Sequence, residues 1–173
     1  MQSVVMTEYD PQWPARFAML RERIAAALGR LALQIEHVGS TSVPNMCAKP
    51  IIDLDVVVEH EDVPAAITAL ETLGYRHEGN LGPDGREAFR WIGEFPEHHL
   101  YICPQGSPAF ERHLRVRDYL RKHPEEAREY AEVKQRLARE YRDNRTKYQL
   151  AKKEFVDALM EKARQEFGNR TNE

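Results

Sequence analysis

The apolar positions in the first part of the chain follow two periods, one typical of helices and one typical of strands. A helix is predicted where apolar residues recur three or four positions apart, at Phe17, Leu20, Ile24 and Leu28. A second helix is expected over residues 63–73. Alternating or β-branched segments predict strands at 4–6, 33–38, 51–58, 75–77, 87–92 and 97–103. The mixture predicts an α+β fold in which helices flank a mixed β-sheet.

The chain after Ser107 keeps a helical period almost to its end. Two sets of apolar or aromatic residues carry this period, namely Tyr130, Val133, Leu137 and Tyr141, then Tyr148, Ala151, Phe155 and Leu159. Pro124 is expected to separate one helix from the next. We therefore expect a single domain over residues 1–173. Its predicted parts are a sheet-containing core at 1–106, a helical C-terminal extension at 107–167 and a frayed tail at 168–173.

The composition is that of an ordinary globular domain. The 173 residues are 42% apolar and 31% charged, which suits one domain with a well-formed core. A mean hydropathy of −0.66 predicts no transmembrane helix. Two cysteines, Cys47 and Cys103, are too few for a disulfide scaffold and lack metal-site spacing. The N-terminal residues do not have the pattern of a signal peptide, so we expect a reducing, cytoplasmic location.

The charge is divided unevenly along the chain. Residues 1–110 contain 8 basic and 15 acidic residues, whereas residues 111–173 contain 17 basic and 13 acidic residues. An acidic body with a basic C-terminal part suits a substrate that carries phosphates and a metal ion. It equally suits a set of solvated helices, so charge alone does not choose between these interpretations.

Asp53 and Asp55 interrupt the strongest predicted strand. Alternate residues of a strand point to the same face, so the two carboxylates are expected to project together. Two like charges within an apolar strand are costly unless a cation neutralises them, and Mg²⁺ is the natural partner of such a pair. The alternative is a strand at the edge of the sheet, with both acids facing water.

The segment before this strand supplies a second candidate feature, a turn of small residues. Gly39, Ser40, Thr41 and Ser42 offer close backbone approach, N–H groups and hydroxyls for gripping a phosphate. Lys49 would add a positive charge for a triphosphate. Taken separately, these residues also suit an ordinary turn and a solvated lysine.

This arrangement resembles the nucleotidyltransferase superfamily, whose minimal pattern is a Gly-Ser turn followed by Asp-x-Asp or Asp-x-Glu on the next strand. A closer resemblance is to the GrpB family of small bacterial proteins. The segments that carry it are His37–Pro44, Ala48–Asp55, His98–Leu100 and Arg117–Arg121, with the pairs Tyr130/Lys134 and Tyr148/Lys152. Two residues depart from the family pattern, because Asn45 stands where glycine is usual and Tyr101 where a third histidine is common.

The resemblance implies a nucleotidyltransferase-like fold and a site built on the acid pair. Asp53 and Asp55 would be catalytic and would hold the metal. Members of the superfamily normally bring a third carboxylate from a neighbouring strand, and the candidate strand here is 97–103. His99 is the candidate for a general base or third ligand, and Glu97 is the alternative. His98, on the opposite and apolar face, is expected to be a packed core residue.

Four basic residues of the C-terminal part complete the candidate phosphate site, namely Arg117, Arg121, Lys134 and Lys152. Arg117 and Arg121 are four residues apart and share a helix face, so they could hold an anion together. A solvated basic helix with salt bridges explains them equally well. The chain has no nucleic-acid recognition motif, and its pI of about 6.2 argues against broad duplex binding.

The sequence thus predicts a Mg²⁺-dependent transfer of a nucleotidyl group from a nucleoside triphosphate, expected to be ATP, to an unidentified small-molecule or protein acceptor. The alternative is a non-catalytic module of the same fold that binds a nucleotide or a CoA-type ligand. It is motivated by GrpB-like domains that occur fused to dephospho-CoA kinase. A phosphohydrolase or phosphotransferase that uses the same metal pair is a third possibility. We expect no nucleic-acid partner and no membrane association, and the sequence does not indicate an oligomeric state.

Overall fold

A computed structural model describes residues 5–80, 85–93 and 95–168. Its centre is a five-stranded mixed sheet in the order β1-β2-β5-β4-β3. The strands are β1 (Gln34–Val38), β2 (Ile52–Val58), β3 (Tyr75–Asn80), β4 (Glu87–Trp91) and β5 (His98–Pro104). The central pair β2/β5 is parallel, and the other three pairs are antiparallel. The predicted α+β class with a mixed sheet is therefore confirmed.

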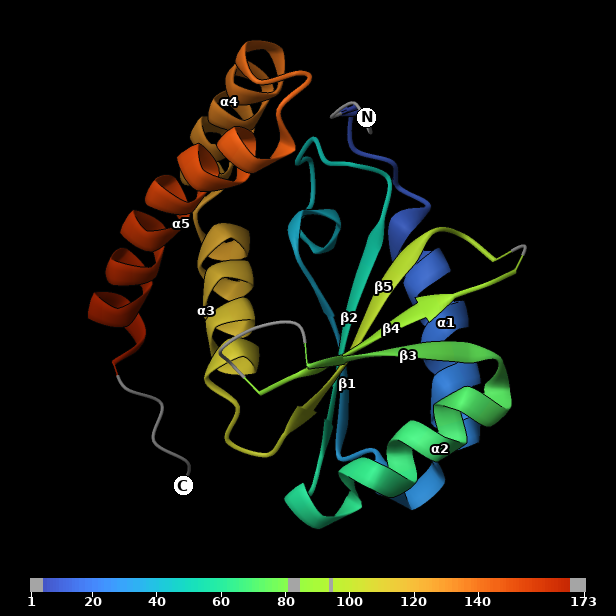
Figure 1. The fold of residues 1–173 in the computed structure, drawn as a ribbon. Coiled ribbons are helices and arrows are strands. Elements are labelled where there is room, and N and C mark those ends of the chain that lie inside the picture. The colour runs from blue at the N-terminus through green and yellow to red at the C-terminus, as the bar shows by residue number, and fades with distance from the viewer. Residues whose placement is uncertain (1–4, 81–84, 94, 169–173) are drawn as a thin grey trace.

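One face of the sheet is covered by α1 (Trp13–Leu28) and α2 (Val63–Leu73), as Figure 1 shows. This face holds the main apolar core, because alternate residues of β2 and β5 pack there against both helices. Leu54 and Leu100 are 0% exposed, as are Ile24 of α1 and Leu70 of α2. The first helix therefore packs on the sheet through the apolar face that its sequence predicted.

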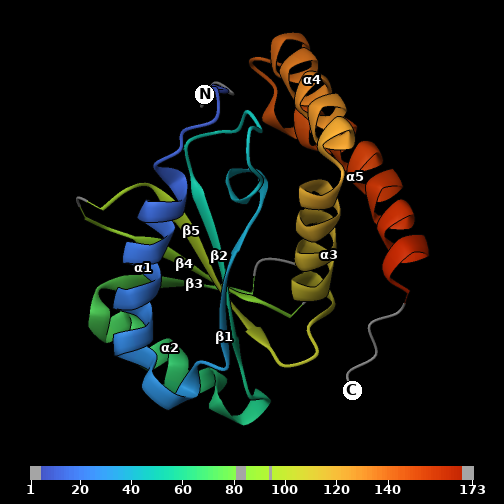
Figure 2. The same ribbon diagram turned by 180° about the vertical axis from the view of Figure 1, so that it is seen from behind.

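The C-terminal helices lie on the opposite side of the sheet, one of them next to the sheet and the other two outside it, as the view from behind shows (Figure 2). These are α3 (Pro108–Lys122), α4 (Pro124–Glu140) and α5 (Arg145–Phe167). The N-cap of α3 is Ser107, whose side chain accepts a hydrogen bond from the Phe110 backbone. Pro124 begins α4 as expected. Among the described residues, no helix is long and apolar enough to cross a membrane.

One detail of the predicted elements is corrected. No strand forms at residues 5–6, and the nearest pairing is one bridge between Thr7 and Ala48. Val4 lies outside the described residues, as does the predicted tail beyond Gly168. The first helix begins at Trp13, and Asp10 accepts a hydrogen bond from the Gln12 backbone just before it.

Candidate active site on the polar face of the sheet

The acid pair lies on the central strand β2, on the face opposite α1 and α2. In the register of the sheet, Asp53 lies beside His99 of β5, and Asp55 lies beside Tyr101. On the other side, Asp55 is paired with Glu36 of β1. Cross-strand partners share a face, so polar side chains from three strands meet at one surface. β2 is therefore not an edge strand, and the edge interpretation of the acid pair is excluded.

Asp55 is a completely buried carboxylate, with 0% of its surface exposed. Its Oδ2 accepts a hydrogen bond from Nδ1 of His113, on α3, at 2.6 Å. Its Oδ1 has no hydrogen-bond partner in the described part of the chain. Because an unsatisfied buried oxygen is costly, this atom is the strongest local indication that the site takes up a further group.

Asp53 is more accessible, with 32% of its side chain exposed. Its Oδ1 accepts a hydrogen bond from Nδ1 of His99 at 2.8 Å. This hydrogen bond raises the pKa of His99, and it outweighs the opposing effect of burial. Each carboxylate of the pair is therefore coupled to a different histidine, one from β5 and one from α3. The sequence pattern did not single out His113, because only the packing of α3 brings it to Asp55.

The small-residue turn packs directly against Asp53. Gly39 has a φ of 71°, and a Cβ at this position would lie 2.3 Å from Oδ2 of Asp53. Only glycine permits this backbone conformation and this close approach together. Ser40 is half-buried and shares a side-chain hydrogen bond with Tyr130 of α4.

The remaining two residues of the turn point into the protein. The Thr41 hydroxyl lies 2.9 Å from Nε2 of His37 and donates to the Ile51 carbonyl. The Ser42 hydroxyl donates to the Gly39 carbonyl at 2.6 Å. Both hydroxyls therefore stabilise the turn, and the phosphate-binding roles predicted for them would require these bonds to be given up.

Three cations gather near Asp53. Burial lowers the pKa of Lys49, and the charge of Arg145 lowers it further while Asp53 opposes the shift. Burial also lowers the pKa of Lys152. The charge of Asp53 raises it, whereas the charges of Lys49 and Arg145 lower it further. The ammonium groups of Lys49 and Lys152 lie 5.5 and 5.9 Å from the ring centroid of Tyr148. Two predicted residues, Lys49 and Lys152, are thus brought together.

Arg145 belongs to this group, although the sequence analysis did not single it out. It is the first residue of α5, and the α4–α5 connection places it where its charge acts on Lys49, Lys152 and His99. Its position depends on how the helical hairpin packs on the sheet. A periodicity argument within one helix cannot supply that information.

The two predicted arginines of α3 hold β1 and the turn in place. Arg117 forms an ion pair with Glu36 at 2.6 Å and donates to the His37 carbonyl at 3.0 Å. It also pairs with Asp118 at 2.8 Å. Arg121 donates to the Ser42 carbonyl at 2.9 Å. A phosphate-binding role for Arg117 would have to compete with two carboxylates.

Lys134 of α4 is 2% exposed and donates to the Cys47 carbonyl at 2.6 Å. Its ammonium group also lies 4.7 Å from the ring centroid of Tyr130. Burial lowers the pKa of Lys134 to about 7. Lys134 therefore stabilises the loop that leads to Lys49 through this hydrogen bond. In the conformation described, its ammonium group does not reach the surface of the site.

The acid pair has the donor chemistry of a magnesium site. Mg²⁺ takes one or two carboxylates and completes its shell with water and phosphate oxygens, and the orphaned Oδ1 of Asp55 suits this need. The described residues contain no group of three His, Cys, Asp or Glu side chains that could hold a metal ion. Glu97 is exposed and lies just before β5, and the third ligand stays a prediction.

Comparisons with known proteins give a family model, a curated relative and two solved structures as matches of different strength. A family model described as GrpB protein matches residues 3–162. UPF0157 protein YqkA of Bacillus subtilis is 39% identical over 165 residues, which are 95% of this chain and 48% of YqkA, so the chain spans about half the length of that relative.

Two solved structures are also similar. The crystal structure of GrpB from Enterococcus faecalis has a TM-score of 0.84 and 35% identity, over 94% of this chain and 99% of that one. Cid1 in complex with its short product ApU has a TM-score of 0.48 and 12% identity, over 74% of this chain and 43% of that one.

Proposed function

This chain belongs to the GrpB family, and we propose that it is a Mg²⁺-dependent nucleotidyltransferase that takes a nucleotidyl group from a nucleoside triphosphate, expected to be ATP. The observation that carries the proposal is the buried Asp55 carboxylate with its orphaned oxygen, two residues from an accessible Asp53. The glycine turn packs against the same Asp53. The acceptor is an unidentified small molecule or protein.

Positioning of the triphosphate is assigned to the turn and to the cations. The backbone at Gly39 and Ser40 lies beside Asp53, and Lys49, Arg145 and Lys152 supply positive charge there. Arg121 and Lys134 are assigned a supporting role, because each donates to a backbone carbonyl of the loop at 42–47. When bound by the two carboxylates, Mg²⁺ would neutralise phosphate charge.

In the proposed reaction, an oxygen of the acceptor attacks the α-phosphorus, the bond to pyrophosphate breaks and the acceptor loses a proton. His99 is assigned to assist that proton loss, with Glu97 as the alternative. Because Nδ1 of His99 is committed to Asp53, Nε2 is the nitrogen that would face the acceptor. Catalysis would consist of positioning and charge neutralisation.

The decisive experiment is a calorimetric titration with a non-hydrolysable ATP analogue, with and without Mg²⁺. We expect binding to the wild type only when Mg²⁺ is present. Asp53→Asn and Asp55→Asn should each weaken it by at least about tenfold, because each removes one carboxylate charge from the metal. Removing Mg²⁺ with a chelator should abolish binding to the wild type.

A matched control is Glu71→Gln, which neutralises an exposed carboxylate on α2, on the other side of the sheet. Its affinity for the analogue should equal that of the wild type. Analogue binding that ignores both Mg²⁺ and the aspartate substitutions would refute the proposed site. Release of pyrophosphate from α-labelled ATP, with the label retained on an acceptor, would then establish transfer.

One observation favours a second function, a nucleotide- or CoA-type binding module without turnover. Both carboxylates already have a histidine partner, and the described residues contain no group of three His, Cys, Asp or Glu side chains that could hold a metal ion. Mg²⁺-dependent binding with no pyrophosphate release in the presence of candidate acceptors would support this module. Free phosphate as the product would instead indicate hydrolysis.

A further inference from the structure

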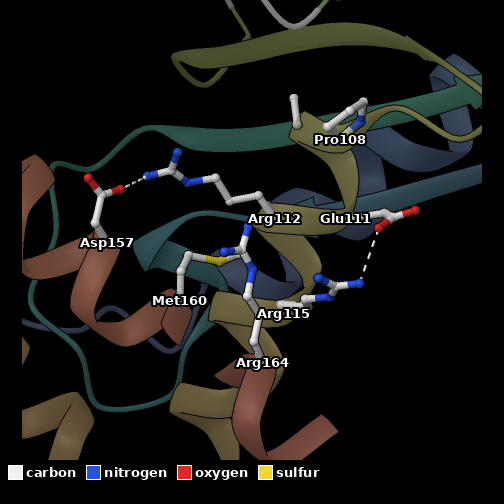
Figure 3. Close-up of a pocket in the computed structure, with 8 residues that line it drawn as sticks. Pro108, Glu111, Arg112, Arg115, Asp157, Met160 and Arg164 are labelled. Atoms are coloured by element: carbon white, nitrogen blue, oxygen red, sulfur yellow. Dashed lines mark hydrogen bonds and ion pairs between the residues drawn. The ribbon is translucent and has the colours of Figure 1, made fainter. Parts of the chain in front are cut away.

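A polar pocket lies between α3 and α5, and neither residue of the acid pair lines it (Figure 3). Its volume is about 330 Å³. Three arginines line it, Arg112 and Arg115 from α3 and Arg164 from α5. The lining also includes two carboxylates, Glu111 and Asp157, and the Met160 side chain. The pocket is small, at the lower end of the range seen for ligand sites, so it suits a compact ligand.

The feature that calls for a ligand is the guanidinium of Arg115. Its side chain is 9% exposed, and it donates through Nη2 to Glu111 at 3.2 Å. Its Nε has no hydrogen-bond partner in the described part of the chain. Because a guanidinium keeps its charge in proteins, burying one of its donors without an acceptor is costly. The charge of an oxyanion bound in the pocket would offset this cost.

The other two arginines leave the pocket with a surplus of positive charge. Arg112 is paired with Asp157 at 2.5 Å, and Lys153 donates to the second oxygen of the same carboxylate, also at 2.5 Å. Within the described part of the chain, Arg164 has one ion pair, a long contact to Glu161 at 4.0 Å. Figure 3 shows its side chain rising from α5 beside Met160 toward the residues of α3. Glu111 and Asp157 therefore neutralise Arg115 and Arg112, and Arg164 remains for an incoming anion.

We propose that this pocket binds the phosphoryl group of a small phosphorylated molecule, with Arg115 and Arg164 as its principal ligands. A tetrahedral phosphoryl group presents several acceptor oxygens and can meet two guanidinium groups that come from different helices. The site goes beyond the proposed nucleotidyltransferase function. Its arginines come from the side of α3 that faces α5, whereas His113 of the same helix contacts Asp55.

The test is a titration with inorganic phosphate at constant ionic strength, followed through the Nε–H resonances of the arginines in NMR spectra. We expect saturable shifts of the Arg115 and Arg164 signals. Arg164→Ala should raise the phosphate Kd measured at Arg115 by about tenfold, because one charged hydrogen-bonding partner is lost. Arg164 is exposed on α5, so this variant should fold.

The matched control is Arg76→Ala, which removes an exposed arginine of β3 and should leave the phosphate Kd at Arg115 unchanged. Unchanged binding of the Mg²⁺-dependent ATP analogue to Arg164→Ala would separate this pocket from the acid-pair site. Failure of phosphate to shift the Arg115 signal would overturn the proposal. Equal shifts with acetate would overturn the assignment to a phosphoryl group.

Discussion

The two faces of β2 differ in residue type although they alternate along one short strand. Toward α1 and α2, its side chains are Ile52, Leu54, Val56 and Val58, each at most 1% exposed. Toward α3, the strand presents Asp53, Asp55 and Val57. One face is a continuous apolar core, whereas the other holds two charges within the same stretch of backbone.

The polar groups on the two faces are also satisfied to different degrees. On the apolar face, His98 lies 2.8 Å from the Tyr75 hydroxyl and 2.6 Å from the Pro96 carbonyl, which serve both ring nitrogens. On the other face, Asp55 keeps an orphaned oxygen. The core histidine is a completed structural group, as the sequence predicted. The aspartate is incomplete, which is typical of a site that awaits a ligand.

The sharpest test of this contrast compares one residue from each face. Leu54→Ala should lower the free energy of unfolding by about 3 to 5 kcal/mol, because it leaves a cavity in the core. Asp53→Asn should lower it by less than about 1 kcal/mol or raise it slightly, because its side chain is partly exposed and it relieves repulsion with Asp55. Urea unfolding measures both. Equal losses would mean that Asp53 serves stability rather than ligand binding.

A second prediction concerns Lys134, the buried lysine of α4. Burial lowers the pKa of Lys134 to about 7, so the unfolded chain holds an additional proton between about pH 7 and 10.5. The free energy of unfolding should therefore rise with pH, by about 2 to 3 kcal/mol between pH 7.5 and 9.5. Lys134→Met should flatten this rise. An identical pH dependence in both proteins would show that Lys134 is not buried as described.

On the apolar face of the sheet, the buried His37 should make stability depend on pH in a different range. Burial lowers the pKa of His37 to about 4, and its ring stacks on Phe17 at 4.8 Å. The unfolded chain binds the proton more tightly, so stability is lost as pH falls from about 6.5 to 4. The loss between pH 6 and 4.5 should be about 2 kcal/mol. His37→Gln should remove this component from pH-dependent unfolding curves, and a wild-type slope in the variant would contradict the assignment.

The smallest expected effect on stability, about 1 kcal/mol, concerns the turn beside Asp53. Gly39→Ala adds a Cβ 2.3 Å from Oδ2 of Asp53, at a backbone φ of 71°. The control is Gly29→Ala, which has a φ of 52° and no atom within 4 Å of its Cβ. Both variants carry backbone strain, but only Gly39→Ala places a Cβ against Asp53. Only Gly39→Ala should therefore also weaken Mg²⁺-dependent binding of the ATP analogue. Equal affinities in calorimetry would separate the turn from the site.

Local rules were enough to predict most of the fold. Period-two alternation placed Asp53 and Asp55 on one face of a strand, and the same rule placed His98 and His99 on opposite faces of another. Helical spacing predicted α1 and the C-terminal helices, and the class of fold followed from the order of elements. The strand expected at 4–6 failed at residues 5–6 because three apolar residues do not specify a pairing partner.

The sequence by itself thus determined which strand carries the acid pair and that a glycine turn precedes it. Only the tertiary structure decided that His113 meets Asp55, that Arg145 joins Lys49 and Lys152, and that Arg117 is committed to Glu36. Periodicity fixes the face of a side chain within its own element, because it follows from backbone geometry. The partners of that side chain depend on how separate elements pack, which no local spacing encodes.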